Sequence, residues 1–207
     1  MKKIVITGGL GYIGTELCKI YSGYSWNDKI TVIDNRFISE RVNQIRNWNM
    51  TFIQGDILDK DLINEHCKDA DIVHHLAGIT DVPRVKSEST FEKEELIRKV
   101  AEEGTQNILD AISDECKIIM PSSHVVYEGL DSIKKNIKED EKTCPSLAYG
   151  KSKDINEKQL KDSGKNFVIL RLASVYGYST DTARIDIMAN FFAKTASQNG
   201  TLRLFAG

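Results

Sequence analysis

The stretch Ile4-Val-Ile-Thr-Gly-Gly-Leu-Gly-Tyr-Ile-Gly14 decides the fold, because it has the pattern of a buried strand, a tight turn and the start of a helix. Gly8, Gly11 and Gly14 are spaced three residues apart in that turn. Glycine tolerates positive φ and lets the backbone approach a phosphate, while the N-terminus of the next helix offers free N–H groups and a partial positive charge. The stretch therefore predicts the pyrophosphate site of a dinucleotide.

An acidic residue follows at the spacing that a dinucleotide site requires. Asp34 lies twenty residues beyond Gly14, at the end of the second apolar run, where its carboxylate can accept hydrogen bonds from ribose hydroxyls. A carboxylate repels a 2′-phosphate, so Asp34 favours NAD over NADP. Arg36 could be recruited by a phosphate, but we interpret it as a solvated loop residue. Asp56 follows the third apolar run and has two equal interpretations, a contact to the adenine amino group or a turn carboxylate.

Short β-rich runs alternate with longer helical patterns along the chain, which is typical of a parallel sheet with crossover helices. We predict an α/β fold, a Rossmann-type, doubly wound parallel sheet with helices on both faces. The 207 residues allow one domain with a substantial core. The expected strands span residues 4–6, 30–33, 51–53, 72–77, 117–120, 167–170 and 202–205, and the expected helices span residues 12–21, 60–67, 91–112, 149–160 and 185–195.

Individual positions within these elements carry further expectations. The first helix has Ile13, Leu17 and Ile20 at helical spacing, and Asp59 is a plausible N-cap for the second. Gly104 weakens the middle of the long helix. The charged stretch 131–142 predicts a solvated surface loop, with a helical turn within it as the alternative. The apolar face of the long helix would consist of Ile97, Val100, Ile108, Leu109 and Ile112.

The composition argues against several classes of protein. With 28 basic and 30 acidic residues the net charge is −2, which disfavours a nucleic-acid binder that relies on a broad basic field. No run approaches the roughly 18 apolar residues of a membrane span, and the first run is too short for a secretory signal, so we expect a cytoplasmic protein without a membrane partner.

His74 and His75 are adjacent on a strand and point to opposite faces, and no other cluster has ligand spacing, so we predict no metal site. The cysteines form no CxxC pair and indicate buried or half-buried thiols in a reducing cytoplasm: Cys18, Cys67, Cys116 and Cys144.

Tyr149-Gly-Lys-Ser-Lys153 supplies the groups needed to oxidise a hydroxyl or reduce a ketone. Tyr149 and Lys153 are four residues apart and share one face of a helix. A free tyrosine has a pKa of about 10. A neighbouring ammonium and a positive nicotinamide ring favour its phenolate, which can take a proton from a substrate hydroxyl. Ser123 follows the fifth strand and could hold the same substrate oxygen, so these three side chains are the candidate catalytic residues.

These residues fall in ordered motifs that resemble the extended short-chain dehydrogenase/reductase family, in its NAD-dependent epimerase/dehydratase branch, whose members act on nucleotide sugars. The resemblance spans essentially the whole chain. The motifs are Thr7-Gly-Gly-Leu-Gly-Tyr-Ile-Gly14, His75-Leu-Ala-Gly78, Pro121-Ser-Ser-His-Val-Val-Tyr127, the pair Tyr149 and Lys153, and Leu170-Arg-Leu-Ala-Ser-Val-Tyr-Gly177.

The resemblance implies NAD as the cofactor, a nucleotide sugar as the substrate, and a homodimer that pairs through the helices 91–112 and 149–160. It also implies Ser123, Tyr149 and Lys153 as the catalytic residues. The residues that it places at the cofactor are Gly8, Gly11, Tyr12, Ile13, Gly14, Asp34, Asn35, Asp56, Ile57, Leu76, Ala77, Gly78, Tyr149 and Lys153, and those at the substrate are Thr80, Ser123, His124, Ser174 and Tyr176.

Three features depart from the family pattern. Ala101 stands where the family has the asparagine that begins NVxGT, so a cofactor-side or structural contact is either missing or supplied elsewhere. Ser174 replaces a second asparagine. Family members are also longer. We therefore expect residues 1–177 to be the NAD-binding Rossmann domain with its catalytic residues, and residues 178–207 to begin a C-terminal substrate-binding region that is largely absent. Variable loops such as 78–88 would add substrate contacts.

Within the branch, the sequence favours an epimerase over a 4,6-dehydratase. Such dehydratases resemble one another in an Asp-Glu pair after the catalytic Thr or Ser, and those positions are His124 and Val125 here. His124 could act as an acid or base, but we prefer to interpret it as a pocket-lining or locally satisfied polar residue. We expect transient oxidation of a ring hydroxyl, at C4, with NAD recycled rather than consumed. The alternatives are a dehydrogenase, reductase or dehydratase of the same family, and a non-catalytic NAD-binding sensor or scaffold.

Overall fold

The computed structural model describes the chain except residues 25–26, 81–89, 133, 180–183, 185–186 and 204–207. Within the described residues, six strands form one parallel sheet in the order β3-β2-β1-β4-β5-β6. The order reverses between β1 and β4, which is the kind of switch point where α/β sheets bind ligands. The strands are β1 (Lys3–Thr7), β2 (Lys29–Asp34), β3 (Thr51–Gln54), β4 (Ile72–His75), β5 (Lys117–Ser123) and β6 (Asn166–Leu172).

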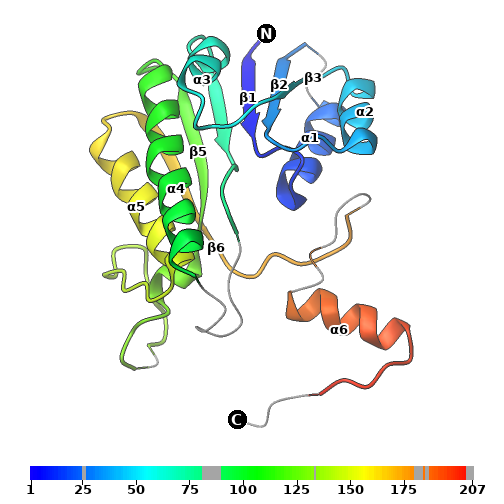
Figure 1. Cartoon of the computed structure of the whole chain (residues 1–207), viewed down its shortest axis with the longest axis vertical. Coiled ribbons are helices and arrows are strands. Elements are labelled where there is room, and N and C mark those ends of the chain that lie inside the picture. The colour runs from blue at the N-terminus through cyan, green and yellow to red at the C-terminus, as the bar shows by residue number, and fades with distance from the viewer. Residues whose placement is uncertain (25–26, 81–89, 133, 180–183, 185–186, 204–207) are drawn as a thin grey trace.

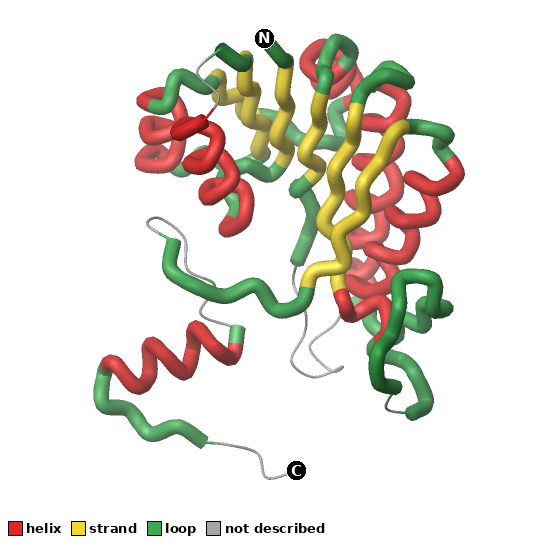
Figure 2. Tube along the Cα trace, turned by 180° about the vertical axis from the view of Figure 1, so that it is seen from behind, coloured by secondary structure: helices red, strands yellow, loops and turns green. Residues whose placement is uncertain are grey.

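Helices cover both faces of the sheet, which confirms the doubly wound fold (Figure 1). Because crossovers between parallel strands are right-handed, the reversal at β1 puts the helices of the two halves on opposite faces. α1 (Tyr12–Tyr24) and α2 (Ser39–Asn47) lie beside β1 to β3, and α3 (Lys60–Cys67), α4 (Phe91–Ala111) and α5 (Ala148–Asp162) lie on the other face. α6 (Met188–Ser197) lies beyond the carboxyl ends of the strands, away from both layers (Figure 2).

Two apolar clusters, one on each face of the sheet, form the core. Ile4 and Ile6 of β1 belong to the cluster under α1 and α2, whereas Val5 between them belongs to the cluster under α3, α4 and α5. This alternation follows from the two-residue period of a strand. Because both faces are covered, the strands are continuous apolar runs, and their positions could be predicted for that reason.

α1 packs through a different side from the one that its sequence suggests. Ile13 and Ile20 are 37% and 57% exposed, so the expected apolar face is wrong at these two positions, whereas Leu17 is partly buried and packs against the core cluster. The helix instead turns its small side chains to the sheet, which lets its backbone lie close to β1. The buried residues of α1 are Gly14, Thr15 and Cys18.

The expectations for the next helices are confirmed. Asp59 caps α3, since its Oδ1 accepts a hydrogen bond from the Leu62 amide at 3.1 Å. The predicted face of α4 is buried, with Val100 partly so. His74 and His75 do point to opposite faces of the sheet, because Tyr21 Oη of α1 lies 2.7 Å from His74 Nε2 while His75 is directed to α4.

Several element boundaries differ from the prediction. The sequence does not predict α2, because Val42 and Ile45 are its only buried residues. β4 ends two residues early, at His75, and β5 continues to Ser123, which is therefore its last residue. The last predicted helix begins at Met188, and residues 185–186 lie outside the described residues. The predicted strand 202–205 is wrong in its described part, since 202–203 have no regular structure, and the rest of it is not described.

Candidate active site

The glycine-rich turn at the carboxyl end of β1 leaves no room for side chains. Gly8 has φ +70°, and its amide donates a 2.7 Å hydrogen bond to the Ile33 carbonyl of β2. A Cβ on Gly8 would lie 2.6 Å from the Ala77 nitrogen, and a Cβ on Gly14 would lie 2.6 Å from the Gly8 oxygen. The turn thus exposes backbone N–H groups at the start of α1, and this donor set fits a pyrophosphate.

Asp34 ends β2 and fixes the glycine-rich turn. Its carboxylate is 5% exposed and accepts hydrogen bonds from the amides of Leu10 and Arg36, both at 3.0 Å. Arg36 Nε also lies 3.3 Å from Oδ1, so Arg36 pairs with Asp34. Its side chain is 56% exposed in the bend after β2, which confirms the interpretation as a solvated loop residue. A carboxylate accepts about four hydrogen bonds, which leaves one position on Asp34 for a ribose hydroxyl.

Asp56 acts as a turn carboxylate. Its Oδ1 accepts a hydrogen bond from the Leu58 amide at 2.9 Å, and its Oδ2 accepts one from Asn35 Nδ2 at 3.0 Å. Asn35 and Asp56 therefore lie together beside Asp34, as expected for one site. Ile57 is 5% exposed and belongs to the core cluster, so its backbone is the part that can face a cofactor.

The carboxyl end of β4 lies beside the glycine-rich turn. The Leu76 amide donates to the Thr7 carbonyl at 3.1 Å, and the Ala77 amide donates to Thr7 Oγ1 at 3.3 Å. Lys153 Nζ lies 4.0 Å from the position of a Cβ on Gly78. The ammonium of α5 thus reaches the end of β4, next to the predicted dinucleotide site.

The three candidate catalytic residues meet at the carboxyl ends of the strands. Ser123, the last residue of β5, is 8% exposed and hydrogen-bonds the Tyr149 side chain. Lys153 follows Tyr149 by one turn of α5, with its Nζ 5.8 Å from the centroid of the tyrosine ring. The structure therefore brings together the hydroxyl, phenol and ammonium that the sequence singled out.

The pKa values of Tyr149 and Lys153 are set mainly by burial. Burial raises the pKa of Tyr149, and the charge of Arg184 and the hydrogen bond to Ser123 lower it in part. Burial also lowers the pKa of Lys153 to about 8. The net shift in the pKa of Tyr149 is upward, so these residues alone do not bring it toward the phenolate, and the expectation also relies on the nicotinamide ring. Arg184 could not be predicted, because it lies in no motif.

Four of the five residues expected at the substrate are exposed, and the fifth, Ser123, is buried. Thr80, Ser174 and Tyr176 are exposed, with Tyr176 69% so. His124 is also exposed, and its Nδ1 lies 3.2 Å from the Leu172 carbonyl. This contact confirms that His124 is satisfied locally. The loop 78–88, expected to contact the substrate, lies outside the described residues from residue 81 onward.

The segment that follows β6 crosses from the sheet to α1 (Figure 2). The Tyr12 hydroxyl donates to the Gly177 carbonyl at 2.5 Å, and the Ser179 hydroxyl donates to Glu16 at 2.6 Å. Tyr12, expected at the cofactor, thus ties this crossing segment to α1. The segment carries the expected substrate residues Ser174 and Tyr176.

A buried ion pair that the sequence analysis missed lies behind Ser123. Glu157 of α5 has a side chain 1% exposed, and it accepts two hydrogen bonds from Arg171 of β6, at 2.8 Å and 2.6 Å. Ser122, next to Ser123, donates to the same carboxylate at 2.6 Å. Burial alone would raise the pKa of Glu157, but hydrogen bonds from Arg171 and Ser122 outweigh it and lower the pKa to about 2.

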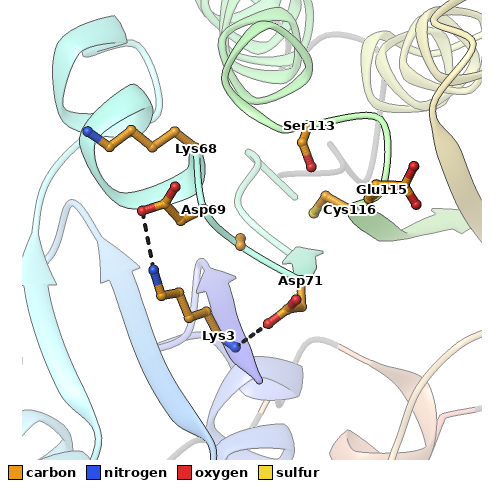
Figure 3. Close-up of a pocket in the computed structure, with 8 residues that line it drawn as sticks. Lys3, Lys68, Asp69, Asp71, Ser113, Glu115 and Cys116 are labelled. Atoms are coloured by element: carbon orange, nitrogen blue, oxygen red, sulfur yellow. Dashed lines mark hydrogen bonds and ion pairs between the residues drawn. The ribbon is translucent and has the colours of Figure 1, made fainter. Parts of the chain in front are cut away.

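A hollow of about 380 Å³ lies at the opposite end of the strands from the candidate catalytic residues (Figure 3). Two of its acidic side chains are bonded to Lys3, since the Lys3 amide donates to Asp71 at 2.6 Å and Lys3 Nζ lies 3.2 Å from Asp69. It lies at the amino ends of the strands, whereas α/β sheets bind ligands at the carboxyl ends, so we do not assign the active site to it. It is lined by Lys3, Lys68, Asp69, Ala70, Asp71, Ser113, Glu115 and Cys116.

The remaining expectations concern cysteines, metals, membranes and assembly. Three cysteines are buried as expected, but Cys144 is exposed. The described residues contain no group of three or more His, Cys, Asp or Glu side chains that could hold a metal ion. None of the described helices has the length and apolar character needed to cross a membrane. The homodimer and the cytoplasmic location stay predictions.

The fold with its glycine-rich turn, and the Ser123, Tyr149 and Lys153 set, define a short-chain dehydrogenase/reductase of the extended, epimerase/dehydratase type. A model of the 3-beta hydroxysteroid dehydrogenase/isomerase family matches residues 5–196, and the chain belongs to that family.

Similar proteins of known activity act on nucleotide sugars. The chain is 32% identical over 130 residues to a UDP-N-acetyl-alpha-D-glucosaminuronate decarboxylase of Bacillus cytotoxicus, covering 61% of this chain and 38% of the relative. It is 27% identical over 205 residues to a CDP-paratose 2-epimerase of Salmonella typhi, covering 84% of this chain and 58% of the relative. The structure of a UDP-glucuronic acid 4-epimerase from Bacillus cereus in complex with NAD matches with a TM-score of 0.79 and 26% identity. The match covers 99% of this chain and 65% of that structure's chain. The chain therefore spans about two fifths to two thirds of these relatives.

Proposed function

We propose that the chain carries the NAD-binding and catalytic part of a nucleotide-sugar epimerase that transiently oxidises a hydroxyl of the sugar ring. The observation that supports this most directly is the grouping of Ser123, Tyr149 and Lys153 beside Gly78. Residues 1–177 would form the NAD-binding domain, and residues 178–207 would begin the substrate-binding region.

The carboxyl ends of β1 and β4 would hold NAD. The glycine-rich turn would bind its pyrophosphate through backbone N–H groups, and Asp34 would accept a hydrogen bond from the adenosine ribose. Lys153, whose Nζ lies beside Gly78, would donate to the nicotinamide ribose. When bound, NAD would supply the group that the side chains lack, a ring that accepts a hydride from carbon and returns it.

Ser123 and Tyr149 would handle the oxygen and the proton of the substrate hydroxyl. The Ser123 hydroxyl would donate a hydrogen bond to that oxygen, and Tyr149 Oη would take its proton while the C–H bond of the same carbon breaks. After the keto sugar turns over, the C–H bond would form on its other face and Tyr149 would return the proton. Because burial opposes the phenolate, nearby positive charge must stabilise it, and Arg184 already does so in part.

Epimerisation at C4 is the finer part of the proposal. Several similar structures are named as 4-epimerases, two of them from Bacillus cereus and Methanobrevibacter ruminantium. His124 and Val125, which follow Ser123, offer no carboxylate for the removal of water, and His124 is held by the Leu172 carbonyl. These residues favour an epimerase over a 4,6-dehydratase.

A screen of nucleotide sugars with the protein and a catalytic amount of NAD would test the proposal, with products read by NMR and NADH by its absorbance. An isomerised sugar without net NADH is the expected result, and Tyr149→Phe should lower the rate by roughly 10²- to 10⁴-fold while NAD still binds. Stoichiometric NADH would identify a dehydrogenase instead. NAD binding without turnover of any sugar, or full activity of Tyr149→Phe, would contradict the catalytic proposal and favour a sensor.

A further inference from the structure

The buried side of α5, the helix that carries Tyr149 and Lys153, is almost entirely polar. Hydrogen bonds are directional, so a helix held by them is fixed in its angle as well as in its position. Leu160 is the only large apolar side chain buried in α5. The buried residues of this helix are Gly150, Ser152, Lys153, Asp154, Asn156, Glu157 and Leu160.

Asn156 connects α5 to α4 in the interior. It is 5% exposed, and its Nδ2 donates to the Ala101 carbonyl and to Thr105 Oγ1, both at 2.8 Å. A carbonyl can only accept, so the amide nitrogen must face α4. Ala101 is the position where the sequence lacks the family's asparagine. The structure thus has an amide at this helix interface, contributed from the opposite helix.

The connection continues from α4 to the glycine-rich turn. Thr105 Oγ1 lies 2.9 Å from His75 Nε2, and His75 Nδ1 lies 3.0 Å from Thr7 Oγ1. Thr7 comes directly before Gly8 and also accepts the Ala77 amide at 3.3 Å. Both ring nitrogens of His75 are therefore bonded. Burial, with a smaller contribution from Lys153, lowers the pKa of His75 to about 3, so the ring stays neutral and the bonds persist at neutral pH.

We propose that Asn156 is a positioning residue: through Thr105 and His75 it fixes α5 against the glycine-rich turn. Lys153 precedes Asn156 by three residues and so lies on the same side of the helix. The linkage would therefore set where Lys153 stands relative to the dinucleotide. This inference rests on the proposed function, because it assumes that the turn and Lys153 hold the same NAD molecule.

Asn156→Ala and Gln159→Ala form a matched pair of variants. Gln159 also bonds α5 to α4, with its Nε2 donating to the Glu102 carbonyl at 2.9 Å. Its Oε1 accepts a longer bond from Asn156 Nδ2, at 3.3 Å, but the bonds that lead from Asn156 through Thr105 and His75 to Thr7 do not pass through Gln159. The measurement is the affinity for NADH, from its fluorescence on binding. We expect about tenfold weaker binding by folded Asn156→Ala, and binding within twofold of the original protein by Gln159→Ala.

Thr105→Val provides a second variant if Asn156→Ala does not fold. It keeps the shape of the side chain and removes the hydroxyl between Asn156 and His75, so it should weaken NADH binding to a similar extent. The proposal would be overturned if folded Asn156→Ala bound NADH with wild-type affinity. If Asn156→Ala does not fold, wild-type affinity of Thr105→Val would overturn it. Equal weakening by Gln159→Ala would also overturn it, since any bond between the two helices would then serve.

The pKa of Lys153, followed by NMR of ¹⁵N-lysine-labelled protein without NADH, gives a second readout. Lys153→Arg assigns the signal. Burial holds this pKa at about 8, so a displaced α5 in Asn156→Ala should let water in and raise it toward the usual value. An unchanged pKa together with unchanged affinity would leave Asn156 with a structural role only. Neither readout needs sugar turnover, so a protein that binds NADH but converts no sugar would refute the proposed function alone.

Discussion

Glu157→Gln is the substitution that most directly tests how α5 is held. The Glu157 carboxylate is paired with Arg171 through two hydrogen bonds and also accepts one from Ser122, with its side chain 1% exposed. Glutamine keeps the shape but removes the charge, which leaves the Arg171 guanidinium buried without its partner. Breaking a buried pair in this way costs roughly 3–5 kcal/mol.

The pKa of Glu157 gives an independent magnitude. A folded-state pKa of about 2 against a usual value of 4.5 corresponds to roughly 3 kcal/mol of stability at neutral pH. Because the folded-state pKa is lowered, this stability is fully present above pH 4.5 and is lost as the pH falls toward 2. For a chain of this size, about 3 kcal/mol lowers the thermal midpoint by roughly 6–12 °C.

The assay is urea unfolding of both proteins at pH 7 and at pH 3.5. We expect Glu157→Gln to be less stable by about 3 kcal/mol at pH 7, with a smaller difference at pH 3.5. Glu95→Gln is the control, because Glu95 pairs with Arg98 on the exposed side of α4 at 3.0 Å, and such surface pairs contribute little to stability. Equal losses in the two variants, or a loss for Glu157→Gln that does not change with pH, would refute the reasoning.

Two further predictions concern buried groups that titrate. Burial lowers the pKa of Lys153 to about 8, so Lys153→Met should raise the unfolding free energy by up to about 3 kcal/mol below pH 8. Urea titrations should find this gain absent above pH 10.5, and a variant that is no more stable than the original protein at pH 7 would contradict the prediction. Burial raises the pKa values of three thiols to between about 11 and 12, so a thiol reagent at pH 8 should modify one cysteine per folded chain, Cys144, and none in Cys144→Ser.

The fold could be predicted from the sequence because its strands are covered on both faces. Buried runs such as Ile4–Ile6 are apolar at every position, and a glycine-rich turn follows the first of them. α2 has no such signal, since it lies at the sheet edge and needs only Val42 and Ile45 for its packing. α1 misled the prediction because the residues that touch the sheet are its small ones, which do not count as an apolar face.

The candidate site could be predicted only where its residues share a local spacing. Tyr149 and Lys153 are one helical turn apart, so their proximity follows from the sequence alone. Asn156 and its acceptor Ala101 are 55 residues apart, and Glu157 is 14 residues from Arg171, so these bonds become visible only when the elements are placed. An asparagine or a glutamate inside a helix otherwise indicates an exposed position.

The two missed residues, Asn156 and Glu157, are adjacent, and this adjacency explains how α5 keeps its orientation. Neighbouring residues of a helix point about 100° apart, so Asn156 reaches α4 while Glu157 reaches β5 and β6. A rotation that kept one set of bonds would break the other and leave buried polar groups unpaired, at a cost of roughly 1–3 kcal/mol for each. The angle of α5 is therefore fixed from two directions. Because Tyr149 and Lys153 extend from the same helix, their distances to Ser123 and to the glycine-rich turn are fixed before any ligand binds, and the free energy of ligand binding need not be spent on ordering them.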